Sequence, residues 1–203
     1  MALNFANNNS LSAITSLPAS ISGGALTLLQ TQTASSSATI DFTSGIDSTY
    51  KEYIFKFLNI HPATDNAELQ FQADTGTNTN YNQTITSTHF RARHDEADTT
   101  ATLQYLTSGD QAQGTSFQRI TSCGNDNDQN INGTFHLFDP SNTTFVKHFL
   151  ITTSSDDYRS EANQRFTAGY FNITTGKTGK YGRWLVVIDG VNTVLAKRWP
   201  YGR

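Results

Sequence analysis

The sequence has few of the residues that mark several common protein classes. Its 203 residues include one cysteine and four prolines, and only 15% are charged, whereas soluble domains average about 25% charged residues. The lone Cys123 excludes an internal disulfide and a cysteine-ligated metal cluster. No apolar run approaches the roughly 18 to 20 residues of a membrane helix, so no membrane insertion is expected.

Neutral polar residues take the place of the missing charges. Threonine (30), serine (18), asparagine (17) and glutamine (11) are together about as frequent as the hydrophobic residues, which form 36% of the chain. Threonine, tyrosine and phenylalanine favour strands, serine and asparagine favour turns, and the strong helix formers lysine, glutamate and methionine are sparse. The composition therefore predicts an all-β protein.

The spacing of short apolar runs makes this prediction more specific. Turn clusters separate these runs every 8 to 14 residues or so, which is typical of a sandwich or barrel. We expect an antiparallel β-sandwich of the jelly-roll class, formed by residues 25–203 as one domain. The expected strands are Leu26–Gln32, Ala38–Phe42, Tyr53–His61, Glu68–Gln72, Asn82–Arg91, Thr102–Leu106, Phe117–Thr121, Gly133–Phe138, Phe145–Thr152, Arg165–Asn172, Trp184–Ile188 and Val191–Leu195.

Turn chemistry predicts two hairpins. Asp139-Pro140 follows the strand that ends at Phe138, and proline there presets the backbone of a turn. Asp189-Gly190 favours a two-residue turn within an atypical C-terminal hairpin, residues 176–203. Within the expected strand Tyr53–His61, the run from Tyr53 to Ile60 is apolar on both faces apart from Lys56 and Asn59. This predicts a central position, between two layers or under a neighbouring subunit.

Residues 1–24 show no sustained helix or strand period, and they end on two glycines. We expect an extended N-terminal arm that orders on assembly. Its apolar residues would supply the contact: Leu11, Ile14, Leu17 and Ile21. The same segment lacks the basic start and apolar stretch of a secretory signal, so synthesis in a cytosol is expected.

Charge is uneven along the chain. Residues 177–203 carry six lysines and arginines against Asp189 alone. A basic end can bind nucleic acid, but these charges are spread out and interrupted by a strand pattern. We therefore expect a subunit contact or solubility, and no nucleic-acid partner.

Catalytic and metal motifs are incomplete. His89 and His94 lie beside Asp95-Glu96, but a spacing of five puts the two histidines on opposite faces of a strand, so an exposed polar strand end is expected. His136 and His148 could be neighbours across a hairpin. Nothing selects a catalytic carboxylate pair, so no enzyme and no cofactor are expected. The weak calcium candidates, which begin like a calcium loop without its glycine and glutamate, are Asp126, Asp128 and Asn130.

Aromatic residues could bind sugars by stacking, although aromatic side chains in sandwiches usually pack in the core. The candidate platforms are Tyr81, Tyr105, Tyr158, Trp184 and Trp199. They support an alternative function, a carbohydrate-binding adhesin that recognises cell-surface glycans.

Several ordered strings carry a resemblance that covers about residues 1–175. They are residues 11–42, SGIDSTYKEYIFKFLNIHPATDNAELQFQ (44–72), DQAQGTSFQ (110–118), NDNDQNINGTFHLFDPSNTTFVKHF (125–149) and FTAGYFN (166–172). These strings resemble virion structural proteins of tailed bacteriophages from marine bacteria. The last 28 residues depart from that family, either by divergence or by a reading-frame change.

The resemblance implies a non-enzymatic protein on the virion surface, which decorates the capsid or forms part of a tail fibre. Its partners would be other virion proteins and itself. A closed homotrimer would cover exposed edge strands. Neutral hydrogen bonds on its surface would also resist salt better than ion pairs do.

Overall fold

The computed structural model describes residues 26–75, 80–174, 182–193 and 195–201. These residues contain thirteen strands and no helix, and every strand pairing is antiparallel. The all-β antiparallel prediction is confirmed. The strands are β1 Thr31–Thr33, β2 Ser37–Phe42, β3 Glu52–Pro62, β4 Ala67–Thr75, β5 Ile85–Asp95, β6 Ala101–Tyr105, β7 Ala112–Gly114, β8 Gln118–Cys123, β9 Ile131–Phe138, β10 Lys147–Asp157, β11 Glu161–Phe171, β12 Gly182–Thr193 and β13 Leu195–Tyr201.

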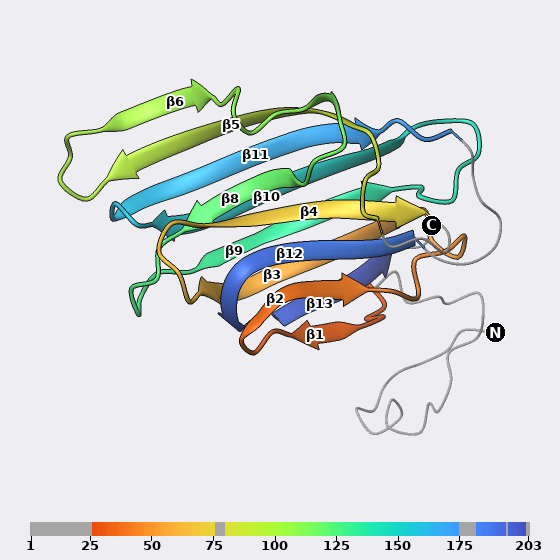
Figure 1. The fold of residues 1–203 in the computed structure, drawn as a ribbon, viewed down its shortest axis with the longest axis horizontal. Coiled ribbons are helices and arrows are strands. Elements are labelled where there is room, and N and C mark those ends of the chain that lie inside the picture. The colour runs from red at the N-terminus through yellow and green to blue at the C-terminus, as the bar shows by residue number, and fades with distance from the viewer. Residues whose placement is uncertain (1–25, 76–79, 175–181, 194, 202–203) are drawn as a thin grey trace, which may run out of the picture.

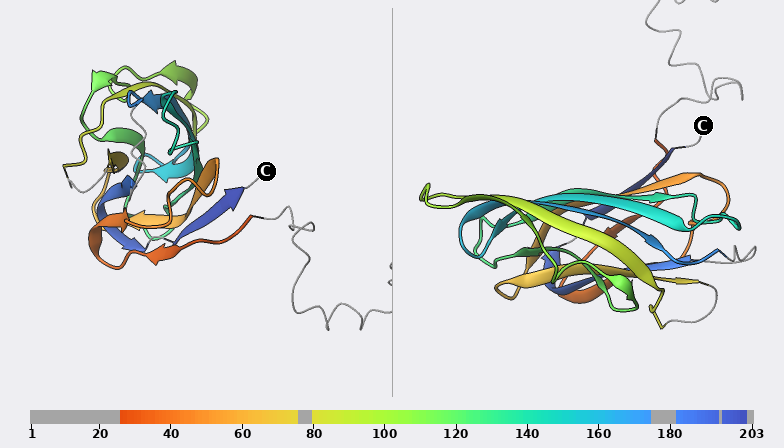
Figure 2. Two further views of the ribbon diagram at one scale, coloured as in Figure 1. Left: turned by 90° about the vertical axis from the view of Figure 1, so that its right-hand side faces the viewer. Right: turned by 90° about the horizontal axis from the view of Figure 1, so that it is seen from above.

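The strands form two layers, seen from the end in the left panel of Figure 2. The large sheet has the order β6-β5-β11-β10-β9-β3-β13-β1, with β7 beside β5. The small sheet has the order β2-β12-β4-β8 and lies in front of the large one in Figure 1. Strand β12 also pairs with the end of β3, so the two layers are joined along one side.

The predicted C-terminal hairpin is wrong. Asp189 and Gly190 lie inside β12, which continues through them with a shift of register between Val187 and Val191. The strand bends there instead of reversing because it has partners on both sides, β2 and β4, up to the Asp-Gly step. Beyond that step it pairs with β2 and β3.

The hairpin at Asp139-Pro140 is confirmed, since β9 and β10 pair in register on either side of it. Lys147 stabilises its loop: the buried ammonium donates hydrogen bonds to the carbonyl oxygens of Asn142, Phe145 and Ile173. These bonds hold Phe145 in the loop, where it is 68% exposed. Strand β10 therefore begins at Lys147, two residues later than predicted.

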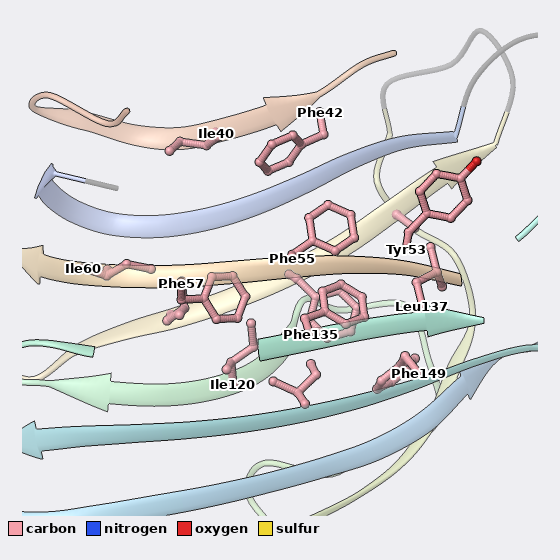
Figure 3. Packing of buried hydrophobic residues seen from close by; sticks show 14 of the residues in the cluster. Ile40, Phe42, Tyr53, Phe55, Phe57, Ile60, Ile120, Phe135, Leu137 and Phe149 are labelled. Carbon is pink, nitrogen blue, oxygen red and sulfur yellow. The ribbon is translucent and has the colours of Figure 1, made fainter. Parts of the chain in front are cut away.

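Strand β3 is central, as predicted, because it pairs with β9 on one side and with β13 on the other. Figure 3 shows Phe55 and Phe57 of β3 pointing into the space between the layers. Phe55 joins a group of buried rings that we call the phenylalanine cluster, whose members are Phe42, Phe55, Phe71, Phe135, Phe149 and Phe171. This cluster fastens the small sheet to the large sheet.

The inward face of the large sheet changes from apolar to polar along its strands. Inward residues of β10, β11 and β5 that are register partners form four rows across these strands. In the order β10, β11, β5, the rows are Phe149, Gly169 and Ser87; Ile151, Thr167 and His89; Thr153, Arg165 and Arg91; Ser155, Asn163 and Arg93. We call the polar residues of the last three rows, together with Gln118 and Ser122 of β8, the polar interior. Most of its side chains are buried.

The sequence-based prediction made two long strands too short, because their inward positions are polar where the predicted strands stop. The prediction ended β10 at Thr152 and began β11 at Arg165, but the strands extend to Asp157 and from Glu161. At the other end of the chain, only Thr31–Thr33 of the first predicted strand is a strand. The short β7 was not predicted.

Candidate functional site

Exposed aromatic rings gather on the outer face of the large sheet. Phe90 of β5 is paired with Tyr105 of β6 on one side and with Phe166 of β11 on the other. The rings of Phe90 and Phe166 are stacked, with centroids 4.9 Å apart and planes 14° from parallel. We call these three residues the outer aromatic strip. Their pairing across three strands places them on one face of the sheet.

The strip lies beside an open sheet edge. All five residues of β6 are exposed, including Leu103 at 76% and Tyr105 at 50%. Among the residues that the structure describes, β6 pairs with β5 alone, so the far side of its backbone is available for another strand. Exposed apolar edges are sites of association unless something covers them.

Hydrogen-bonding groups also adjoin the strip. The Tyr105 hydroxyl donates a hydrogen bond of 2.6 Å to Asp110 Oδ2, and this bond raises the pKa of Tyr105. The bond orients the ring while its face stays exposed. An oriented ring with a carboxylate at its tip can stack on a sugar and accept hydrogen bonds from its hydroxyls, or it can pack against a protein surface.

The other predicted stacking residues do not join this strip. Tyr81 precedes β5 and is half-buried, with its hydroxyl 3.4 Å from Asp41 Oδ1. Tyr158 lies in the turn between β10 and β11, away from the middle of β11 where the strip lies, and the Arg159 guanidinium lies over its ring at 4.5 Å. For Trp184 and Trp199 only the backbone is described, within β12 and β13. Tyr105 is thus the candidate that the fold places on an aromatic surface.

The predicted assembly arm lies outside the described residues. This applies to all of its apolar positions, which are Leu11, Ile14, Leu17 and Ile21.

The weak calcium candidates lie on the loop between β8 and β9. Asp126 and Asp128 are exposed, and the side-chain oxygen of Asn130 accepts a hydrogen bond from Asn132. Within the described part of the chain, no group of three or more histidine, cysteine, aspartate or glutamate side chains could hold a metal ion.

Acidic residues from two distant parts of the sequence meet at one shallow depression of about 350 Å³. Its lining includes Asp95, the last residue of β5, Glu96 directly after it, and Asp156 near the end of β10. Burial, followed by the charge of Glu96, raises the pKa of Asp156. Asp95 caps the turn after β5 by accepting hydrogen bonds from Thr99 and Thr100, which lower its pKa to about 2. The sequence could not predict that these carboxylates lie close together, because their proximity depends on the register of β5, β11 and β10.

His89 is not on an exposed strand end, which corrects the sequence-based expectation. It is fully buried, and its Nδ1 lies 2.8 Å from Thr167 Oγ1. The ring packs so closely on Gly109 that a Cβ there would lie 2.3 Å from His89 Cδ2. Burial, followed by the charge of Arg165, lowers the pKa of His89 to about 4, so the ring is neutral at pH 7.

The remaining histidines have separate partners. His94 forms an ion-pair contact of 3.2 Å with Asp98 on the surface. His136 lies opposite Leu150, not opposite His148, so the predicted cross-strand pair is wrong. The Nδ1 of His136 is 2.7 Å from a carboxylate oxygen of Glu52, and the ring of His148 meets Tyr170 edge-on.

Comparison with protein-family models, with curated proteins and with solved structures found no match to this chain. In the part of the chain that the structure describes, no helix is long and apolar enough to cross a membrane.

Proposed function

We propose that this protein is a non-enzymatic structural component of a phage virion, made in the host cytoplasm and displayed on the particle surface. It would decorate the capsid or form part of a tail fibre. Its partners would be other virion proteins and further copies of itself, arranged as a homotrimer. The proposal includes the jelly-roll class for the sandwich and an extended N-terminal arm, residues 1–24, which anchors the protein to the particle.

The observation that carries the proposal is the open edge at β6 beside the outer aromatic strip. A fully exposed strand with Leu103 and Tyr105 facing outward is an aggregation risk for a free monomer, and a closed assembly of copies removes it. The ordered strings that resemble virion proteins and the salt-tolerant neutral composition support the same role.

Light scattering of the full chain tests the proposed self-association. We expect the isolated protein to form an assembly of three copies. We expect Leu103→Lys to shift it to monomers because a charge on an edge strand opposes pairing. Phe145→Lys is the matched control, since Phe145 is also exposed but lies on the loop between β9 and β10. A wild-type monomer would contradict the trimer. Dissociation by the control variant alone would contradict a subunit contact at β6.

The virion location and the arm need a test on assembled particles. A reconstruction of the intact virion should locate this chain on the outside, and deletion of residues 1–24 should abolish incorporation while the remaining chain still folds. Absence of the protein from purified virions, or undiminished incorporation after the deletion, would reject the corresponding part of the proposal.

The exposed ring of Tyr105 favours one alternative function, an adhesin or receptor-binding protein that recognises host surface glycans. Saturable binding on a glycan array, lost in Tyr105→Ser and kept in Tyr158→Ser, would support it. Tyr158 is a fitting control because Arg159 covers one face of its ring. No binding by the wild-type protein would leave the structural role as the better account.

A further inference from the structure

The polar interior contains a positive charge that has no ion-pair partner among the described residues. Arg165 is only 2% exposed. Its Nη2 donates a hydrogen bond of 2.8 Å to Ser122 Oγ, and its Nε donates a long one of 3.4 Å to Asn163 Oδ1. Both acceptors are neutral. Across the described residues, no carboxylate lies within ion-pair distance of Arg165, although a buried charge is normally paired.

A second arginine is placed directly opposite the first. Arg91 of β5 is the register partner of Arg165 of β11, and both belong to the same inward row. Like charges opposite one another on neighbouring strands repel and destabilise the pairing. The Arg91 side chain donates a hydrogen bond to the neutral amide of Gln104, and within the described residues it too has no ion-pair partner.

A third arginine adds to this charge from the small sheet. Arg119 of β8 forms an ion pair of 3.0 Å with Glu68, so part of its charge is compensated. Burial, followed by the charges of Arg119 and Arg91, lowers the pKa of Arg165 to about 10. The charges of Arg91 on β5 and Arg119 on β8 therefore both act on Arg165 of β11.

Each of these arginines also has a buried nitrogen without a hydrogen-bond partner among the residues that the structure describes. The unpartnered atoms are Arg165 Nη1, Arg91 Nε and Arg119 Nε. All three are donors, because a guanidinium group has no acceptor. Native proteins rarely leave such donors unpaired in the interior, and a single negatively charged ligand would satisfy donors and charge together.

We propose that a small inorganic anion, a halide or a tetrahedral oxyanion, binds in the polar interior and is held by Arg165 with Arg91 and Arg119. The anion would neutralise the repulsion between the paired arginines and would tie β8 of the small sheet to β5 and β11 of the large sheet. Arg91 is only partly buried, so exchange with solvent would occur on its side. The site is distinct from the outer aromatic strip and does not depend on the virion role.

Thermal unfolding of the full chain in different salts tests the proposal. Ionic strength is kept constant with sodium gluconate, whose anion is too large for an enclosed site, while chloride, bromide, sulfate or phosphate is varied. We expect the free energy of unfolding to rise by RT ln(1 + [L]/Kd) with the concentration of a fitting anion, and the midpoint of unfolding to rise with it. A response to chloride and bromide alone identifies a halide, and a response to sulfate or phosphate identifies an oxyanion.

Variants separate this binding from general salt effects, because sulfate also stabilises proteins by exclusion from their surface. Arg165→Gln should lose the anion-dependent rise, and the surface control Lys51→Gln, which removes an exposed ion pair with Asp139, should keep it. An equal rise in wild type and in Arg165→Gln would overturn the proposal.

A direct measurement covers the case in which Arg165→Gln does not fold. Crystals of the wild-type chain grown in sodium bromide, or in selenate as an oxyanion, should show an anomalous peak at hydrogen-bond distance from Arg165 Nη1. A peak there supports the proposal. Only water at that position, with both anions, would overturn it.

Discussion

The two halves of the interior are built on the same strands by opposite means. Towards the start of β10 the inward residues are Phe149 and Ile151, and towards its end they are Thr153, Ser155 and Asp157. The first half excludes water and packs rings from both sheets, which stabilises the fold through apolar burial. The second half is equally buried but depends on hydrogen bonds and charge compensation.

The comparison shows that burial and stability are separate properties here. In the phenylalanine cluster every buried atom gains from leaving water. In the polar interior a buried group contributes only when it has a partner, since an unsatisfied polar group costs free energy. The variants below test this difference, in order of decreasing effect.

Phe135→Ala should cause the largest loss. The centroid of its ring lies 5.0 Å from that of Phe55 and 4.7 Å from that of Phe71. Truncation therefore removes contacts to both sheets and leaves a cavity. We expect the free energy of unfolding to fall by about 3 to 5 kcal/mol, as is usual for a buried phenylalanine. Urea unfolding measures this, and a loss below about 1 kcal/mol would show that the cluster is not the main core.

Acid should weaken the polar interior through His89. Its pKa is about 4 in the fold against 6.5 when unfolded, so the unfolded state binds more protons between these values and stability falls as the pH drops from 6.5 towards 4. At about 1.4 kcal/mol per pKa unit, the loss is about 3 kcal/mol. The charges acting on the ring are those of Arg165, Arg119, Asp110 and Arg91.

Urea unfolding at several pH values between 4 and 7 measures this loss. His89→Gln should remove it, whereas His94→Gln, which changes an exposed histidine, should retain it. The lowered pKa of Asp95 acts below pH 3.8, outside this window. A pH dependence that is the same in wild type and His89→Gln would contradict the assignment.

Gln118→Leu should destabilise the protein although it makes the interior more apolar. The buried amide donates to the carbonyl oxygens of Gly109 and Arg119, and its oxygen accepts a hydrogen bond from Ser87. Leucine leaves these partners unsatisfied, so we expect a loss of about 2 kcal/mol. Unchanged stability in urea unfolding would mean that these hydrogen bonds contribute little.

Thr153→Val should have the smallest effect and the opposite sign. Thr153 is buried, and among the described residues its hydroxyl has no hydrogen-bond partner. A methyl group in its place therefore removes the free-energy cost of burying an unpaired hydroxyl. We expect stability to be unchanged or to rise by up to about 1 kcal/mol. A clear destabilisation would indicate a partner for the hydroxyl, such as a bound water.

Strand β3 shows which parts of the fold could be predicted. Its apolar run from Tyr53 to Ile60 placed it correctly at the centre, because a strand buried on both faces has to be apolar on both. The hairpin at Asp139-Pro140 was also predictable, since its turn chemistry is local. The Asp189-Gly190 turn was wrong because the partners of β12 on both sides, which are distant in sequence, outweigh a local turn preference.

The candidate sites were less predictable. Tyr105 was among five aromatic candidates, but its neighbours Phe90 and Phe166 come from other strands, and only the register brings them together. His89 was expected on an exposed strand end, and Arg165 was only the first residue of an expected strand. Neither spacing nor composition distinguishes an inward polar position from an outward one when both kinds of position are polar.

The sequence by itself determined that this chain is an antiparallel all-β protein, because composition, turn residues and the spacing of apolar runs are local properties of the chain. Only the tertiary structure decided which polar residues are inside. Strand pairing sets that choice across long sequence separations, so it placed Arg165 opposite Arg91 within the interior and left Leu103 and Tyr105 on an open edge.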